Sequence, residues 1–167
     1  LGYYRIGPTT RHALRYLDPY APLMAAVTGF DDREKLNLIL AYRYIISYEP
    51  YNFKGHVTDF PLTLAYGKKI DALRKKYRAW IWDAEFRDTL GATVTADGPV
   101  THTVFQNSSG KRAVVLINPT RARSISVTLD LPGSATLVSA TPEQPDVQPV
   151  SGMLRVPARS VAVVMEQ

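Results

Sequence analysis

The hydrophobic pattern of this chain changes its period near residue 90. Before that point, residues 1–30 are poorly periodic, but in two later stretches apolar side chains recur at steps of three and four residues, as they do along one face of a helix. From Thr101 onward, apolar and polar residues alternate, as they do on a half-buried strand. We therefore expect a different architecture on each side of this change.

The first part predicts strands and helices in alternation. The apolar stretch 23–27 reads as a buried strand, and a helix is expected to begin at Asp31, with Glu34 in capping-box spacing. The β-branched and aromatic run YIISY at 44–48 predicts a second strand, which Pro50 ends because it lacks a backbone donor. A loop of about eleven residues follows.

A second, longer helix is predicted over residues 61–82. Pro61 suits its first turn, and Thr58 or Asp59 is a plausible cap. Its apolar residues follow helical spacing: Leu62, Ala65, Tyr66, Ile70, Leu73, Tyr77, Trp80 and Ile81. The alternation of strand, helix, strand and helix is typical of an α/β fold.

The second part predicts short strands separated by turns, with no helix between them. The six candidate strands cover residues 101–106, 112–117, 124–129, 135–139, 153–156 and 160–165. Gly, Pro and Asn cluster between them, and this spacing favours an antiparallel β-sandwich. The expected fold class is thus α/β plus all-β, with one domain over residues 1–92 and a β-sandwich domain over residues 93–167.

Composition supports this division. All ten tyrosines, both tryptophans and four of the five phenylalanines precede residue 90, whereas valine is concentrated after it.

No apolar run approaches the roughly 20 residues of a membrane span, so no membrane association is expected. The beginning LGYYRIG shows no signal peptide, and we expect a processed chain or a fragment. The compartment stays undetermined.

Charge and cysteine content narrow the chemistry. The chain has no cysteine, which excludes disulfides, thiolate metal sites and cysteine nucleophiles. The net charge of +5 comes largely from a basic run between Lys68 and Arg78. Such a run can bind nucleic acid, but we interpret it as the solvated face of the long helix and expect no nucleic-acid partner.

The loop after the second predicted strand carries the densest cluster of chemically able side chains. These candidate substrate-binding residues are Glu49, Tyr51, Asn52, Lys54 and His56. In an α/β barrel, residues just after a strand line the mouth of the active site. These side chains can bind a sugar, because the carboxylate, amide and amine pair with its hydroxyls and the aromatic ring stacks on its C–H face. The alternative is structural: Glu49 and Asp59 cap helices, and Tyr51 and Phe53 fill the core.

Other constellations point away from further chemistry. The three histidines share no metal-ligand spacing, and no serine-hydrolase elbow or nucleotide-binding glycine loop is present, so neither a metal nor a cofactor is expected. The segment WDAEFRDT reads as an ion-paired hinge between the two parts. The valine-rich part lacks tryptophan and tyrosine, so we expect it to be structural rather than sugar-binding.

Two stretches resemble a known class of enzyme. One order of segments resembles the C-terminal end of (β/α)8-barrel glycoside hydrolases with an appended β-sandwich. It consists of YIISYEPYNFKG, a polar loop, a long helix ending in RKKYRAWIWDAEFRDT, and then VFQNSSGKRAVVLINPT. The α-galactosidase-like enzymes and their uncharacterised relatives are the nearest type. The pair GKRAVVLINP and LRVPARSVAVVME is similar to the terminal domain of many such enzymes.

The resemblance implies that residues 1–92 are only the last strands and helices of a TIM barrel, since eight βα units need about 250 residues. The catalytic residues of such enzymes usually lie on earlier strands, so they are unassigned here. The chain is then expected to act in hydrolysis of O-glycosidic bonds, on a carbohydrate substrate, only with a second polypeptide or an oligomer that completes the barrel.

A second function class stays open. The chain could be a non-catalytic assembly or scaffold subunit, with the aromatic part as an interface and the sandwich as a spacer. Sugar binding by the assembled complex distinguishes the two hypotheses.

Overall fold

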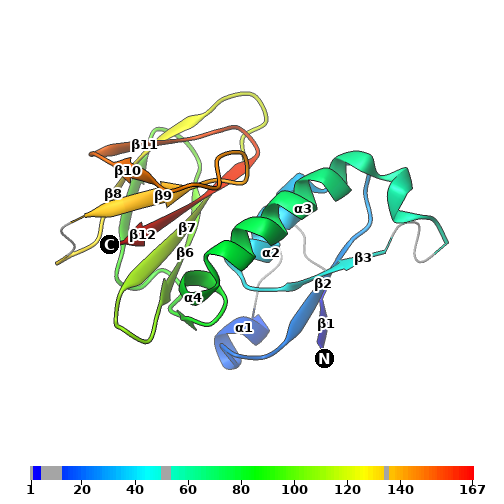
Figure 1. Ribbon diagram of the computed structural model, residues 1–167, viewed down its shortest axis with the longest axis horizontal. Helices are drawn as coiled ribbons and strands as arrows, with labels where there is room; N and C mark the ends of the chain where they lie inside the picture. Colours follow the sequence, from blue (N-terminus) through cyan, green and yellow to red (C-terminus); the bar gives the residue numbers. More distant parts are fainter. Residues whose placement is uncertain (1, 5–12, 50–53, 134–135) are drawn as a thin grey trace.

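The computed structural model describes residues 2–4, 13–49, 54–133 and 136–167. A small parallel sheet and a β-sandwich lie on opposite sides of a helical layer (Figure 1). Helix α2 (Arg33–Ala41) contacts strands of both sheets, so the helical layer connects the two parts of the chain.

The parallel sheet follows the predicted alternation. Its strands are β1 (Gly2–Tyr4), β2 (Leu23–Val27) and β3 (Ile45–Tyr48), in the order β1-β2-β3. All neighbours are parallel, and the connections contain α1 (Ala13–Leu17) and α2. The strands predicted at 23–27 and 44–48 are therefore confirmed.

The long predicted helix is interrupted. After a 3-10 turn at Val57–Asp59, α3 spans Pro61–Lys76 and α4 spans Arg78–Ile81. Pro61 occupies the first turn as expected, but no side chain caps the helix. The helix breaks at Tyr77, whose buried ring donates from Oη to Pro145 O at 2.6 Å. A continuous helix to Trp82 was therefore wrong, and the break coincides with a contact to the other part of the chain.

The second part is an antiparallel β-sandwich, as the alternating pattern indicated. Its larger sheet has the order β10-β9-β12-β7-β6-β4 and its smaller sheet the order β11-β8-β5. The strands are β4 (Glu85–Phe86), β5 (Thr93–Ala96), β6 (Thr101–Gln106), β7 (Arg112–Asn118), β8 (Ile125–Asp130), β9 (Leu137–Ala140), β10 (Gln148–Val150), β11 (Met153–Val156) and β12 (Ser160–Glu166).

Three of these strands were not predicted. The two-residue strand β4 lies within a charged segment, and β10 has three residues and contains a proline. Strand β5 alternates exposed threonines with partly buried Val94 and Ala96, but it has only four residues and lies at a sheet edge. Such short strands give a weak signal in sequence interpretation. Strand β4 precedes residue 92 and pairs with β6, so the chain enters the sandwich sheet before the expected domain boundary, which stays a prediction.

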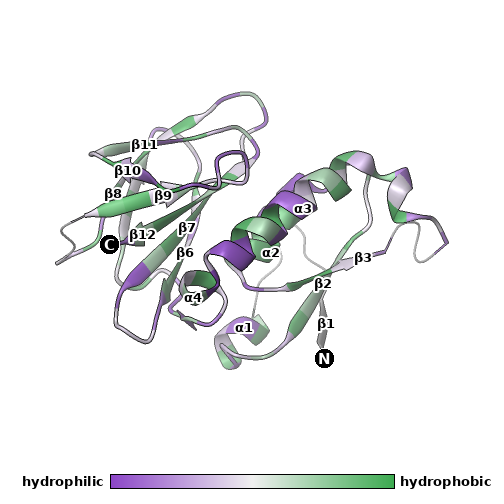
Figure 2. Cartoon of the chain, viewed as in Figure 1, coloured by the Kyte–Doolittle hydropathy of each residue, from purple (hydrophilic) through white to green (hydrophobic). Residues whose placement is uncertain are grey.

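One hydrophobic core runs from the parallel sheet through the helices to the sandwich. It contains Leu23 of β2, Ile39 of α2, Ile70 of α3, Val115 of β7 and Val163 of β12. Figure 2 shows apolar residues on α2 and along β7, β9 and β12, and hydrophilic stretches along α3. A second core lies between the two sandwich sheets and includes Val104, Val114 and Ile125. The helical layer therefore shares its core with the larger sandwich sheet.

Arg159 joins the sandwich to the beginning of α2. Its Nη1 donates to Asp31 Oδ2 at 2.6 Å, and its Nε donates to Glu34 Oε1 at 2.9 Å. Its carbonyl accepts from Asn37 Nδ2 at 3.1 Å. The expected capping box is therefore wrong: α2 begins at Arg33, and the two carboxylates bind Arg159 instead. Burial alone would raise the pKa of Glu34, but the hydrogen bonds and charge of Arg159 outweigh it and lower this pKa.

Arg159→Met should lower the free energy of unfolding by about 1–2 kcal/mol, because two carboxylates lose their charge-assisted hydrogen bonds in a partly exposed site. Arg155→Met is the matched control, since Arg155 is exposed on β11. Urea unfolding of the three proteins measures the difference. An equal effect of both substitutions would contradict the role of Arg159 as an anchor.

Gly67 lets α3 lie directly on Tyr48 of β3. A Cβ at this position would overlap the Tyr48 hydroxyl and lie 3.1 Å from ring carbon Cζ. Both residues lie at the interface between the sheet and the helix, where Tyr48 is partly buried. The glycine is therefore required by packing, although glycine weakens a helix interior.

Gly67→Ala should destabilise the protein by about 1–3 kcal/mol, because the new methyl group displaces the Tyr48 ring. In a Tyr48→Phe background the same substitution should cost less, because the overlapping oxygen is absent. Thermal or urea unfolding of the four proteins in this cycle measures the coupling. The same cost in both backgrounds would show that the two side chains do not meet.

Candidate functional site

The candidate site lies at the edge where β2 and β3 end. Parallel strands present their carboxyl ends at one edge of a sheet, and in α/β folds this edge carries the binding site. Thr28 follows β2 and Glu49 follows β3. The Glu49 amide donates to Val27 O at 3.0 Å, so the pairing of the strands extends to the first residue of the predicted substrate loop.

Glu49 is a buried carboxyl, with 2% of its surface exposed. Ser47 Oγ donates to its Oε1 at 2.6 Å, from the same face of β3. Burial disfavours the charged form and raises the pKa of Glu49 above its usual value. A carboxyl with a raised pKa binds its proton more tightly, and only its protonated form can donate a hydrogen bond to a sugar hydroxyl.

The turn between β2 and α2 is held rigidly beside Glu49. Asp32 Oδ2 accepts from the amides of Thr28 at 2.6 Å and Gly29 at 2.7 Å. Thr63 of α3 accepts from the Asp32 amide at 2.9 Å and donates to Gly29 O at 2.8 Å. A Cβ on Gly29 would lie 2.6 Å from Asp32 Oδ1, so the turn requires glycine. Asp32 is thus occupied in shaping the turn.

The recess at this edge is small. Its volume is about 10 Å³, and it is lined by Val27, Thr28, Gly29, Tyr48, Val57, Phe60 and Thr63. This space admits one water molecule but not a sugar ring. The described residues at this edge therefore do not form a complete sugar pocket.

The structure separates the predicted site residues by exposure. Lys54 and His56 are on the surface, whereas Glu49 is buried. The His56 amide donates to Asp59 Oδ2 at 3.0 Å, and its side chain accepts from the Asp59 amide, so the pair caps the 3-10 turn. Asp59 therefore caps the 3-10 turn and not the long helix, for which it was a plausible cap. Tyr51 and Asn52 lie outside the described residues.

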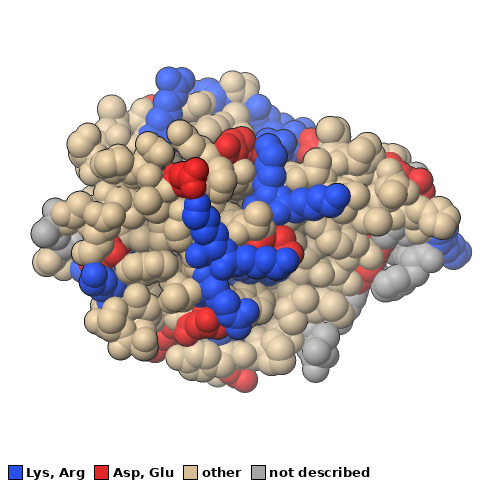
Figure 3. All heavy atoms as spheres, in the orientation of Figure 1, with Lys and Arg blue, Asp and Glu red and all other residues tan. Residues whose placement is uncertain are grey.

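The remaining sequence candidates have structural partners. Four of the six basic side chains between Lys68 and Arg78 form ion pairs: Arg74 and Lys75 with Asp71, Lys76 with Asp146, and Arg78 with Asp83. Figure 3 shows acidic side chains beside the basic ones on this face. In the hinge segment, Arg87 pairs with Glu85 on the surface, where an ion pair contributes little.

The described ranges contain neither a candidate metal cluster nor a helix suited to a membrane. Among these residues, no three His, Asp or Glu side chains are grouped so that they could hold a metal ion. None of the described helices has the length and apolar character needed to cross a membrane. His102 is half-buried on β6, and burial lowers its pKa.

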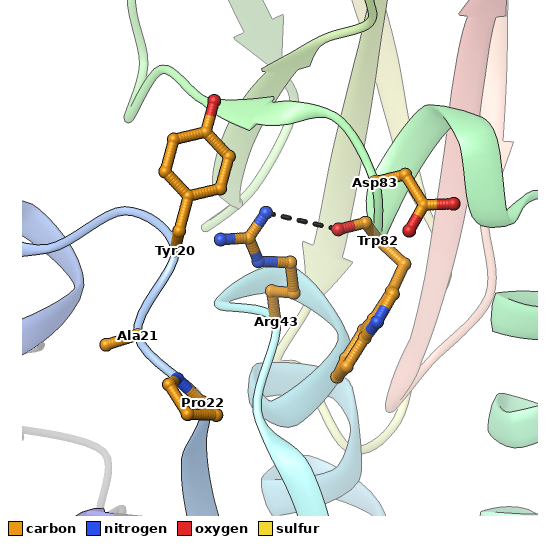
Figure 4. A pocket seen from close by; sticks show the side chains of 6 residues that line it. All are labelled: Tyr20, Ala21, Pro22, Arg43, Trp82 and Asp83. Carbon is orange, nitrogen blue, oxygen red and sulfur yellow. Dashed lines mark hydrogen bonds between the residues drawn. The ribbon is translucent and has the colours of Figure 1, made fainter.

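Sequence reasoning missed a larger cavity at the opposite edge, where β2 and β3 begin. Its volume is about 350 Å³, and its lining residues are Tyr20, Ala21, Pro22, Arg43, Trp82 and Asp83 (Figure 4). They come from three separate segments, so no local motif marks them. Ser47, by contrast, could have been found, because it lies two residues before Glu49 on the same strand face.

Solved structures of an arabinopyranosidase share this fold. The chain is similar to a GH27 β-L-arabinopyranosidase from Geobacillus stearothermophilus, with a TM-score of 0.51 and 15% identity over 83% of this chain and 30% of that one. A variant of the same enzyme in complex with arabinose gives a TM-score of 0.51, 15% identity and coverages of 83% and 31%. An endo-β-1,6-glucanase gives a TM-score of 0.44 and 16% identity over 98% and 40%.

At this identity the comparisons show the fold alone: the chain shares a glycosidase-related fold that includes a β-sandwich. It spans about 30% of the length of the arabinopyranosidase. No protein-family model and no curated protein matches the sequence.

Glu49→Gln should make stability less dependent on pH. Because the folded pKa of Glu49 is raised, the unfolded state releases the proton first as the pH rises above 4.5. Glu49 therefore contributes its full stability below this pH and loses it as the pH rises through the folded pKa. The variant should lose less unfolding free energy between pH 4.5 and 7 than the wild type.

Urea unfolding at several pH values measures this difference. Asp130→Asn is the control, since Asp130 is an exposed carboxylate of β8. If Glu49→Gln and the wild type follow the same pH curve, the buried carboxyl does not titrate as described.

Proposed function

We propose that the chain is the C-terminal portion of a glycoside hydrolase that cleaves O-glycosidic bonds. It contributes the last strands of a (β/α)8 barrel, a loop that contacts the substrate, and a structural β-sandwich. The observation that carries the proposal is the position of Glu49, a buried carboxyl directly after the last of three parallel strands. In barrels of this type, that edge of the sheet carries the chemistry.

The order of elements supports the barrel. Within the described residues, β1 and β3 each pair with one neighbour only, so both outer edges of the parallel sheet can accept a further strand. A closed barrel has eight strands. The missing strands belong to a preceding portion of the same protein or to a second polypeptide, and they cover the face of the sheet that a barrel fills with side chains.

The roles of the loop residues follow from their chemistry. Glu49 lies at the floor of the proposed site and presents its buried carboxyl to a sugar hydroxyl. In this proposal Lys54 and His56 supply polar groups to the substrate, and Tyr51 and Asn52, which lie outside the described residues, supply a ring and an amide. Glycoside cleavage requires two carboxyls. In this proposal both lie on the earlier barrel strands, and Glu49 positions the sugar for them.

The first test is an assay of the chain alone and of the native assembly. A panel of aryl glycosides that includes a β-L-arabinopyranoside is suitable, because the similar solved structure acts on that linkage. We expect no turnover by the chain alone and turnover by the assembly, in which intact-mass measurement should show a longer chain or a second polypeptide. An assembly that neither binds nor cleaves sugars would favour the scaffold hypothesis instead.

In the active assembly, Glu49→Gln should lower kcat/KM by about 10- to 100-fold, because the amide changes the hydrogen bonding at the buried floor of the site. Asp130→Asn, on the distant strand β8, should leave kcat/KM unchanged. Circular dichroism confirms that both variants are folded. Unchanged kinetics in folded Glu49→Gln would remove this residue from the site.

A further inference from the structure

The cavity at the opposite edge of the parallel sheet has the size of a small-molecule site. Its volume of about 350 Å³ lies within the usual range for ligand pockets. It opens where β2 and β3 begin, so it is separated from Glu49 by the length of the strands. In Figure 4 the guanidinium of Arg43 lies between the rings of Tyr20 and Trp82.

The guanidinium of Arg43 has N–H donors that no described residue uses. Only 6% of its surface is exposed, and its φ of 54° turns the chain sharply between α2 and β3. Its Nη1 donates to Trp82 O at 3.1 Å and to Ala84 O at 2.8 Å. No described residue accepts a hydrogen bond from its Nε or Nη2. A guanidinium has five N–H donors in a planar fork, so the remaining ones are available to a planar acceptor.

The charges around the cavity favour an anion. Behind Arg43 lies the fully buried Arg15, whose nitrogens donate to the carbonyls of Tyr42, Asp18, Pro19 and Arg43. Burial and the charge of Arg43 lower the pKa of Arg15 to about 10. Among the described residues, neither arginine has a carboxylate within ion-pair distance, although the charge of Asp18 acts on both and that of Asp83 acts on Arg43. Asp83, on the rim, is paired with Arg78 at 2.9 Å.

The aromatic side chains that line the cavity favour a ligand that contains a ring. The Tyr20 ring lies 5.2 Å from the Arg43 guanidinium carbon and is 64% exposed, so one of its faces is accessible. Trp82 also lines the cavity (Figure 4), and the guanidinium carbon of Arg74 lies over its ring, 4.7 Å from the centroid. Aromatic walls stack on the apolar faces of sugar and aromatic rings. The planar fork of a guanidinium matches the two oxygens of a carboxylate, with which it can form two parallel charge-assisted hydrogen bonds.

We propose that this cavity is a binding site for a small carboxylate carried on a ring, of about the size of one monosaccharide. The carboxylate pairs with Arg43, and the ring lies against Tyr20 and Trp82. A sugar acid and an aromatic acid both present this chemistry. The site does not depend on the proposed function, because none of its residues belongs to the Glu49 edge.

A titration of the full chain by NMR or calorimetry at low salt tests the proposal. The probes are glucuronate and benzoate, each with a neutral partner of the same ring, glucose and benzyl alcohol. We expect a dissociation constant of about 1 mM or lower for at least one carboxylate, and at least about tenfold weaker binding of its neutral partner. The carboxylate that binds more tightly identifies the source.

Three outcomes would overturn the proposal. They are the absence of binding by either carboxylate at about 10 mM, equal binding of a carboxylate and its neutral partner, and equal binding of inorganic phosphate, which would show that the ring plays no part.

Substitutions of the residues that line the cavity test whether the ligand binds there. Tyr20→Ala should weaken it about three- to tenfold through the loss of a wall, and Arg43→Lys at least about tenfold through the loss of the fork. Asp83→Asn should strengthen it, by about two- to fivefold, because a negative charge leaves the rim. Met153→Ala, on an exposed position of β11, is the control.

Arg43 also supports the backbone, so its variant could fail to fold. Tyr20 and Asp83 are exposed, and their opposite effects test the site without it. Unchanged affinity in both of those variants would place the ligand elsewhere and overturn the assignment.

Discussion

The burial of α2 on both of its sides is the constraint on which the rest of the structure depends. Leu36, Ile39 and Leu40 are almost fully buried, between the parallel sheet on one side and the larger sandwich sheet on the other. Each such side chain contributes about 1.5–3 kcal/mol when it leaves water. Neither sheet alone could provide this, because each covers only one face of the helix.

The ends of α2 are also held by groups from elsewhere in the chain. A helix leaves amides at its beginning and carbonyls at its end without internal partners. Arg159 binds the carboxylates near the beginning, while Thr103 Oγ1 donates to Ala41 O at 2.8 Å and Arg15 Nε donates to Tyr42 O at 2.9 Å near the end. These contacts fix the helix, and with it the strands whose ends carry Glu49 and whose beginnings carry the Arg43 cavity.

Sequence reasoning found the features that depend on local chemistry. Side-chain spacing predicted the apolar run of β2 and the alternation of the sandwich strands. The backbone chemistry of proline predicted that β3 ends before Pro50, and this places Glu49 directly after the strand. It failed where a distant partner decides the outcome. Asp31 and Glu34 have capping spacing but bind Arg159, which lies more than 120 residues away in sequence. Tyr77 has helical spacing but contacts a sandwich loop, and Tyr20, Arg43 and Trp82 meet only because the fold brings three segments together.

The shared core has a consequence for the order in which the molecule acquires its structure. Strand β12 supplies Val161 and Val163 to the core around α2, and Arg159, just before it, binds the beginning of that helix. During synthesis the parallel strands leave the ribosome first, but the side chains that close their core leave more than 100 residues later. The Glu49 edge therefore cannot reach its final packing until β12 has emerged, and until then the apolar surface of α2 needs protection from aggregation.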